Sequence, residues 1–198
     1  MASVVLSGDT SGTITISAPA VSGSNTQTLV ATTGTLAPIV SGTAVASTSG
    51  TSIDFTSIPS WVKRITVMFN GVSTNGSSPV NVQLGTSGGV QNTGYSGTGI
   101  GIGPGGGLAV TALSSGFQLC DNLNSAAAAT WRGSMTISLL DSSTGIWTCA
   151  SNTARGDSAT TGLCQGSKTL SGTLDRVRIT TVNGTDTFDA GSINILYE

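Results

Sequence analysis

The chain has 198 residues, of which only 8% are charged, with a formal net charge of −2 at pH 7 and no histidine. So little charge excludes the basic surface that nucleic-acid binding requires, and the lack of histidine excludes Ser-His-Asp triads, Cys-His dyads and histidine-containing metal sites. No apolar run reaches the roughly 18 residues of a membrane span, and the N-terminus has neither a basic region nor a long apolar stretch, so we expect no signal peptide.

The composition predicts a β protein. The chain contains 29 Ser, 31 Thr and 28 Gly, and 37% of its residues are hydrophobic. Disordered chains usually combine low hydrophobicity with high net charge, and this chain has neither property. Its length fits one domain of ordinary size plus an extension.

Residues 1–50 differ from the rest of the chain. They contain one charged residue, Asp9, and no aromatic residue. Short apolar alternations, such as that of Ile14 and Ile16, predict strands. A segment with so few large side chains cannot close a core alone. We therefore expect residues 1–50 to pack on the C-terminal part of the chain or on other copies of themselves.

The stretch Ser41–Ser52 has the composition of a linker, and stronger strand signals follow it in residues 51–198. The alternating runs are separated by turn sequences such as Asn70-Gly71 and Asn183-Gly184. Strands without an amphipathic helix favour an antiparallel, jelly-roll-like β-sandwich. Trp61 and Trp131 are assigned to its core, together with the inward-facing positions Ile65, Val67, Phe69, Ile137, Leu139, Val177, Ile179, Ile193 and Ile195.

Glycines are densest between residues 85 and 107, which we interpret as a loop. Glycine loses more conformational entropy on ordering than any other residue. The loop is therefore either mobile or pinned by close backbone contact with a neighbour. The string Gly101-x-Gly103-x-x-Gly106 within it lacks the strand before and the helix after that a dinucleotide site needs.

Other candidate motifs favour structural roles. Arg155-Gly156-Asp157 reads as a solvated turn. Asp186 and Asp189 supply too few ligands for a calcium site. Free, half-buried thiols are expected at Cys120, Cys149 and Cys164, although the sequence leaves a bridge between the last two open. We expect no catalytic residues, no cofactor and no metal.

Two regions resemble bacteriophage fibre proteins. The N-terminal run Ser-Gly-Asp-Thr-Ser-Gly-Thr-Ile-Thr-Ile-Ser-Ala-Pro-Ala-Val-Ser-Gly-Ser-Asn-Thr, residues 7–26, resembles a module of tail-fibre and other virion proteins. Residues 52–76 and 174–198 are similar to the C-terminal domain of short phage fibres. The resemblance implies a β-rich homotrimer, made in the host cytoplasm and located in the virion, with an N-terminal attachment part and a distal β domain. It supplies no catalytic residues.

On this resemblance, the division of labour follows the change in composition near Gly50. Residues 1–50 are expected to intertwine in a trimer and to anchor to other virion proteins, at the tail, a portal-vertex adaptor or the capsid. The anchoring residues are expected to be Val4, Val5, Leu6, Ile14 and Ile16. Tyr95 and Trp147 are the candidates for contact with a host receptor, such as a surface polysaccharide, although Trp147 could equally fill the core.

Three functions remain in competition. The leading prediction is a short tail fibre, and a head-attached fibre or capsid decoration protein would be built in the same way. The second is a carbohydrate-binding module that reads host surface polysaccharide. The third, a depolymerase, is disfavoured by the length of the chain and by the lack of a carboxylate constellation. Neither membrane insertion nor nucleic-acid binding is expected.

Overall fold

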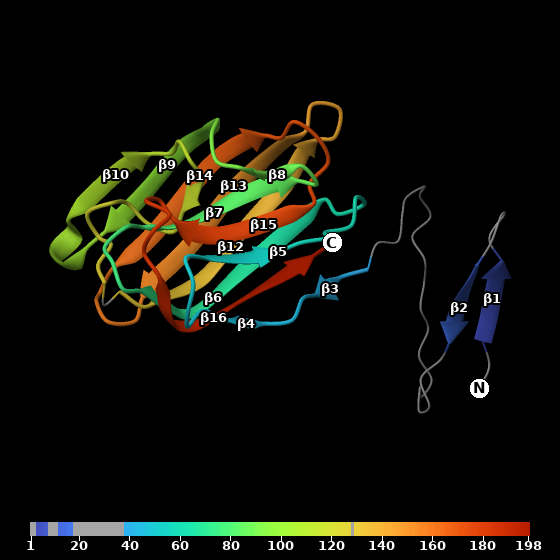
Figure 1. The fold of residues 1–198 in the computed structure, drawn as a ribbon, viewed down its shortest axis with the longest axis horizontal. Coiled ribbons are helices and arrows are strands. Elements are labelled where there is room, and N and C mark those ends of the chain that lie inside the picture. The colour runs from blue at the N-terminus through green and yellow to red at the C-terminus, as the bar shows by residue number, and fades with distance from the viewer. Residues whose placement is uncertain (1–2, 8–11, 18–37, 128) are drawn as a thin grey trace. The chain divides into compact units, whose positions relative to one another are not determined.

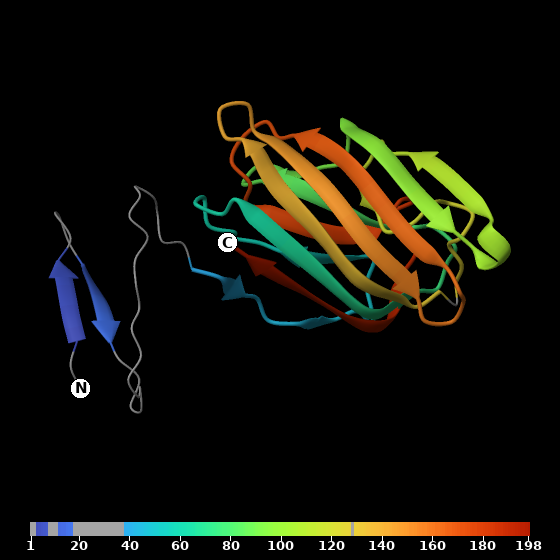
Figure 2. The ribbon, with the colours of Figure 1, turned by 180° about the vertical axis from the view of Figure 1, so that it is seen from behind.

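The computed structural model describes residues 3–7, 12–17, 38–127 and 129–198, and the chain divides into two units, Met1–Leu36 and Ala37–Glu198. The second unit consists of two antiparallel sheets that face each other, a larger one and a smaller one (Figures 1 and 2). The predicted all-β fold, an antiparallel sandwich, is confirmed. Within the described residues no helix is long and apolar enough to cross a membrane.

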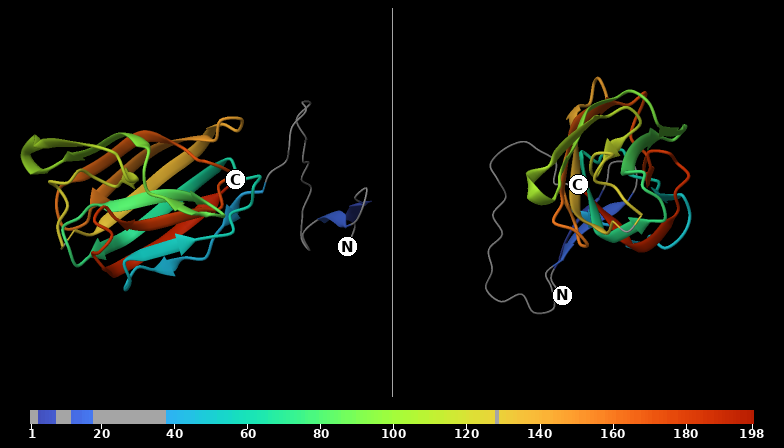
Figure 3. Two further views of the ribbon diagram at one scale, coloured as in Figure 1. Left: turned by 45° about the horizontal axis from the view of Figure 1, so that its top comes forward. Right: turned by 90° about the vertical axis from the view of Figure 1, so that its left-hand side faces the viewer.

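The larger sheet has nine strands, and its central strands are long. Its spatial order is β10-β9-β14-β13-β12-β6-β16, with two short strands, β3 and β4, on the outer side of β16. Figure 3 shows from the side how this sheet lies against the smaller one. The bounds are β3 (Val40–Ser41), β4 (Val45–Ala46), β6 (Arg64–Thr74), β9 (Tyr95–Ile102), β10 (Leu108–Ala112), β12 (Trp131–Asp141), β13 (Ile146–Arg155), β14 (Thr161–Thr169) and β16 (Phe188–Tyr197).

The smaller sheet has five strands in the order β11-β7-β15-β5, with β8 paired on β7. The bounds are β5 (Ser52–Phe55), β7 (Val80–Thr86), β8 (Gly89–Gln91), β11 (Phe117–Gln118) and β15 (Arg176–Thr181). Its register places Ile53 opposite Ile179, and Ile179 opposite Val82. These side chains are buried and form one row of the core. The short turn η1 (Pro104–Gly106) joins β9 to β10 in the other sheet.

The period-2 alternation read from the sequence matches the buried face of the sheets. Eight of the nine predicted inward-facing residues are buried, and Leu139 is partly buried against the same core. In the larger sheet Val67 lies opposite Met135 on one side and Ile195 on the other. A shift of one residue would have exposed this whole row. The register predicted for these strands is therefore confirmed.

The glycine-dense stretch 85–107 is mostly strand, so its interpretation as a loop is wrong. Gly97, Gly99 and Gly101 alternate along β9, and Gly99 and Gly101 are buried. A Cβ atom on Gly101 would lie 1.8 Å from Asp121 Oδ1, and one on Gly99 would lie 3.3 Å from the carbonyl oxygen of Cys120. The backbone that follows β11 thus lies directly on β9. Of the two alternatives, pinning by close backbone contact is confirmed, and the neighbour belongs to the same chain.

The linker expected at Ser41–Ser52 is instead part of the sandwich. In β4, Val45 pairs with Ile193, and in β3, Val40 pairs with Tyr197. Ser47 is fully buried, and its hydroxyl donates to the Ala190 carbonyl at 2.7 Å. The second unit therefore begins at Ala37 and not after residue 50. Backbone pairing at the edge of a sheet does not need large side chains, which explains why the composition pointed elsewhere.

The Asn70-Gly71 sequence forms a bulge within β6, and not a turn. Strand β6 continues to Thr74, and the β12 register passes from Asn70 to Val72 without a partner for Gly71. Gly71 has φ +68°, which suits a residue without a Cβ. The Asn183-Gly184 turn was predicted correctly: the Gly184 amide donates to the carbonyl of Thr181, the last residue of β15, at 3.0 Å, and Gly184 has φ +70°.

Trp131 is buried, but the assignment of Trp61 to the core is wrong. Trp61 is 38% exposed, and its ring packs on Tyr197 with the centroids 5.9 Å apart. The Val62 amide donates to the Pro59 carbonyl at 3.1 Å, which closes a turn before β6 begins. Val62 points into the core as a result, and Trp61 lies outside it.

Among the described residues of the first unit, β1 (Ser3–Ser7) pairs with β2 (Thr13–Ser17) in a hairpin. The register places Val4 opposite Ile16 and Leu6 opposite Ile14. Val5 and Leu6 are each 54% exposed, and Ile16 is 62% exposed. A lone two-stranded hairpin is marginally stable in water. This hairpin leaves large apolar side chains uncovered within its own unit.

Candidate functional site

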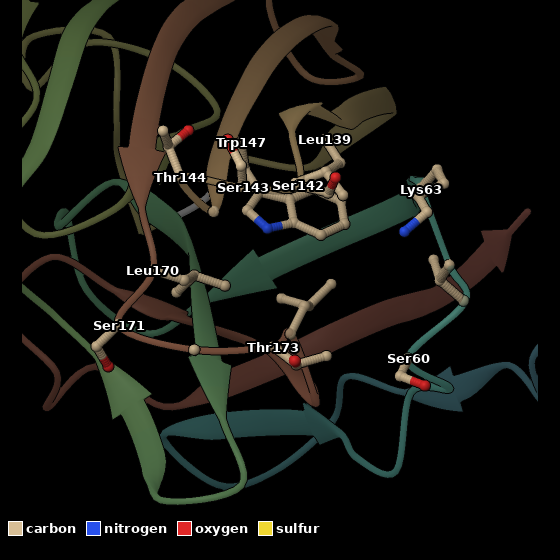
Figure 4. A pocket seen from close by; sticks show the side chains of 14 residues that line it. Ser60, Lys63, Leu139, Ser142, Ser143, Thr144, Trp147, Leu170, Ser171 and Thr173 are labelled. Atoms are coloured by element: carbon tan, nitrogen blue, oxygen red, sulfur yellow. The ribbon is translucent and has the colours of Figure 1, made fainter.

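One pocket opens where three segments of the sandwich meet. They are the turn from β12 to β13, the segment Leu170–Leu174 after β14, and the segment Ser60–Lys63 before β6. The pocket has a volume of about 420 Å³, within the range of small-molecule sites. Figure 4 shows the Trp147 indole at its centre, with Thr173 and Lys63 on different sides of the same space.

Backbone hydrogen bonds fix the three walls relative to one another. The Leu170 amide donates to the Gly145 carbonyl at 3.0 Å, which ties the segment Leu170–Leu174 to the turn from β12 to β13. The Leu139 amide donates to the Lys63 carbonyl at 2.8 Å, which ties the segment Ser60–Lys63 to β12. The turn itself is closed by the Gly145 amide, which donates to the Asp141 carbonyl at 2.9 Å. The pocket is therefore formed before any ligand arrives.

The pocket has a buried apolar floor and an exposed polar rim. Four floor residues are buried, and the fifth, Leu139, is partly buried; the five are Val62, Leu139, Trp147, Leu170 and Leu174. The rim carries six exposed hydroxyl side chains, from Ser60, Ser142, Ser143, Thr144, Ser171 and Thr173. A hydroxyl both donates and accepts hydrogen bonds. This arrangement suits a ligand that is itself rich in hydroxyl groups.

Charge at the pocket comes from Lys63 alone among the residues that line it. Nearby Asp141 turns its carboxylate to its own turn, where the Ser143 hydroxyl and amide donate to Oδ1 at 2.7 and 2.8 Å. These hydrogen bonds lower the pKa of Asp141 below its ordinary value. The lining therefore carries a positive charge and no carboxylate.

The two residues expected to touch a receptor are core residues, because both rings are covered by protein. Trp147 is 3% exposed and Tyr95 is 5% exposed. Tyr95 spans the two sheets: its hydroxyl oxygen accepts a hydrogen bond from the Leu84 amide at 2.6 Å, and its ring meets Phe117 edge-on at 5.0 Å. Burial raises its pKa. Neither ring offers an open face for stacking on a sugar, although Trp147 does close the floor of the pocket.

The expected anchoring residues lie in the β1–β2 hairpin, away from the pocket in sequence. Val4, Val5 and Leu6 belong to β1, and Ile14 and Ile16 belong to β2. The exposure of Val5, Leu6 and Ile16 leaves their side chains available for contact. Anchoring by these residues stays a prediction.

The three cysteines are free and buried. Cys149 lies opposite Gly166 and Cys164 lies opposite Ser151, so the two thiols are diagonal neighbours on β13 and β14. Burial and the neighbouring Cys164 thiol raise the pKa of Cys149. A thiol whose pKa is raised by burial is a poor nucleophile. Among the described residues no group of three or more His, Cys, Asp or Glu could hold a metal ion.

The Arg155-Gly156-Asp157 turn is closed by its own charges. Arg155 forms an ion pair with Asp157, whose Oδ1 also accepts a hydrogen bond from the Thr130 amide at 3.1 Å. Arg155 donates a further hydrogen bond to the Asn124 carbonyl at 2.9 Å. The hydrogen bonds from Arg155 are the main cause that lowers the pKa of Asp157 to about 2. Both charges of the turn are thus occupied within the chain.

We expect the Arg155–Asp157 interaction to be lost in acid, and the chain to lose stability with it. An unfolded aspartate has a pKa of about 3.9, so the lowered pKa of Asp157 contributes stability above that pH, which is lost as the pH falls from about 4 towards about 2. Urea unfolding should show that D157N destabilises the chain at pH 7 and that this difference shrinks towards pH 2. The exposed Asp189 serves as control in D189N. A difference for D157N that is independent of pH would contradict the prediction.

Comparison with known proteins gives no function for the pocket or for the hairpin. Comparison of the chain with family models, with curated proteins and with solved structures found no match. The features that bear on function are therefore the hydroxyl-lined pocket, the exposed hairpin and the resemblance of the sequence to phage fibres.

Proposed function

We propose that the chain is a structural component of a phage virion, a short homotrimeric tail fibre that is attached by its N-terminus and meets the host surface with its sandwich. The observation that carries the proposal is the uncovered β1–β2 hairpin, whose Val5, Leu6 and Ile16 are each more than half exposed. Water disfavours such a surface on a chain that stays alone. The resemblance of residues 7–26 to a virion module supports the same function.

The two units suit different tasks. The sandwich buries its own core, so it can fold without the hairpin and present its loops outward. The hairpin has an apolar surface and lies in a segment almost free of charge, which suits contact with copies of itself and with other virion proteins. Attachment to the capsid would need the same features. Electron microscopy of the virion that contains the chain distinguishes the two attachment points.

Removal of residues 1–36 is the direct test of assembly. Light scattering should give a trimer for the full chain and a folded monomer for the variant that lacks residues 1–36, because the cut falls between the two units. A cut after residue 50 would also remove β3, β4 and the buried Ser47, and is expected to destabilise the sandwich itself.

Point variants keep the chain length and refine this test. The double change L6S/I16S should abolish trimer formation and incorporation into particles, because it removes two exposed apolar side chains of the hairpin. The matched control T13S/T15S changes exposed polar residues of β2 and should leave both unchanged. A full chain that is monomeric in solution and absent from virions would overturn the proposed function.

The pocket favours a second candidate, a carbohydrate-binding module that acts without a virion. Its six rim hydroxyls and its preformed walls are the specific observation for this function. The two candidates differ in assembly, since a binding module has no need of the exposed hairpin. Saccharide binding by a chain that neither trimerises nor enters particles would favour the second candidate.

A further inference from the structure

We propose that the pocket binds a sugar residue that bears a carboxylate, with Lys63 as its counter-charge. This inference deepens the proposed contact with the host surface and rests on it. The saccharide class follows from the rim, where hydroxyl side chains come from all three walls, among them Ser60, Ser142 and Thr173. The charge follows from Lys63.

Lys63 stands at the pocket without an ionic partner. Within the described part of the chain its amino group forms no ion pair, whereas its neighbour Arg64 pairs with Glu198. Figure 4 shows the side chain reaching towards the space in front of Trp147. The backbone on both sides of Lys63 is held, because its amide donates to the Glu198 carbonyl at 2.8 Å and its carbonyl accepts from the Leu139 amide. A cation on a fixed backbone, next to a cavity without carboxylates, favours an anionic group in the ligand.

The floor explains why recognition relies on polar groups. Trp147 is too deeply buried to offer the face of its ring. A sugar therefore cannot stack on it, which is the usual way in which tryptophan binds sugars. The apolar floor can still cover the C–H side of one sugar ring while the rim hydroxyls meet its hydroxyl groups. Binding energy then comes from hydrogen bonds and from the Lys63–carboxylate pair, and hydrogen bonds to charged groups are the stronger ones.

The test uses the full chain and matched ligands. An array of oligosaccharides that contain glucuronic, galacturonic or sialic acid is probed beside the same oligosaccharides with their carboxylates reduced to alcohols. Titration calorimetry then follows the tightest pair. We expect the acidic form to bind about tenfold more tightly than its reduced partner, and this preference to weaken as salt is raised, because Lys63 is exposed.

Variants separate the charge from the pocket. K63Q should remove the preference for the acidic form, whereas R132Q, which also removes one exposed positive charge but lies on β12 away from the pocket, should keep it. T173V should weaken the binding of both the acidic and the reduced oligosaccharide, because it removes a rim hydroxyl and keeps the side-chain shape. Equal binding of both forms, a preference that survives in K63Q, or no retention of any acidic glycan would each overturn the inference. The trimer and its place in particles are measured separately, so these results leave the proposed function standing.

Discussion

Replacement of Gly97 by alanine is expected to unfold the β9 side of the sandwich. Gly97 has φ +145°, and a Cβ atom there would lie 2.2 Å from the backbone oxygen of Gln165 and 2.4 Å from the Cα atom of Gly166. Both atoms belong to β14, the paired strand, so neither can turn away as a side chain could. We expect the free energy of unfolding to fall by at least about 3 kcal/mol, in the range of severe overpacking.

Two glycines near η1 serve as matched controls for this change. Gly107 has φ −62° and Gly105 has φ +75°, and a Cβ on either would meet nothing within 4 Å. In urea unfolding, the free energy of unfolding of G107A should therefore be close to that of the wild type. That of G105A should be slightly lower, through backbone strain alone, and that of G97A should be far lower than both. If G97A were no less stable than G105A, the close contact between β9 and β14 would be refuted.

Truncation of Phe69 to alanine should cost about 3–5 kcal/mol of stability, the usual loss for a buried phenylalanine. The side chain is 4% exposed in the middle of β6, and its strand position lies opposite Ile193 of β16. The cavity that the truncation leaves lies within the core, so its surroundings can close only in part. Chemical denaturation of wild type and F69A measures the difference.

The neighbouring Met68 tests the register in the same strand. Met68 is partly exposed on the other face of the sheet, opposite Asn194, so M68A should cost about 1 kcal/mol or less. A larger loss for M68A than for F69A would mean that the inner and outer faces of β6 are exchanged. The pair of variants thus checks the fold independently of the proposed function.

The strands with large alternating side chains could be predicted from the sequence. Ile65 and Val67 in β6, and Val177 and Ile179 in β15, are buried, and the residues between and beside them point to the other face of the sheet. Alternation is a local property of a strand with one face in the core, so it is visible without knowledge of the partner strands. The edge strands β3 and β4 gave no such signal, because pairing with β16 is carried by backbone groups that every sequence has.

The candidate site depended on contacts that are far apart in the sequence. The walls of the pocket come from segments around residues 60, 143 and 172, which only the packing of the sheets brings together. The signal available in the sequence was a set of short Ser- and Thr-rich turns, and such turns also occur elsewhere in this chain. Trp147 is a candidate for receptor contact by residue type, but it is 3% exposed beside its cross-strand partner Leu139, which makes it part of the floor.

The β class, the buried face of the long strands and a separate N-terminal segment could be predicted from composition and period-2 alternation, because both signals act over a few residues at a time. The packing of the two sheets, by contrast, explains why Gly99 and Gly101 of β9 lie against the segment after β11, why Trp61 lies outside the core and Tyr95 inside it, and how Lys63 comes to a hydroxyl-lined pocket. Each of these depends on which distant segment lies opposite, and that is fixed by how the two sheets pack together and not by local residue preference.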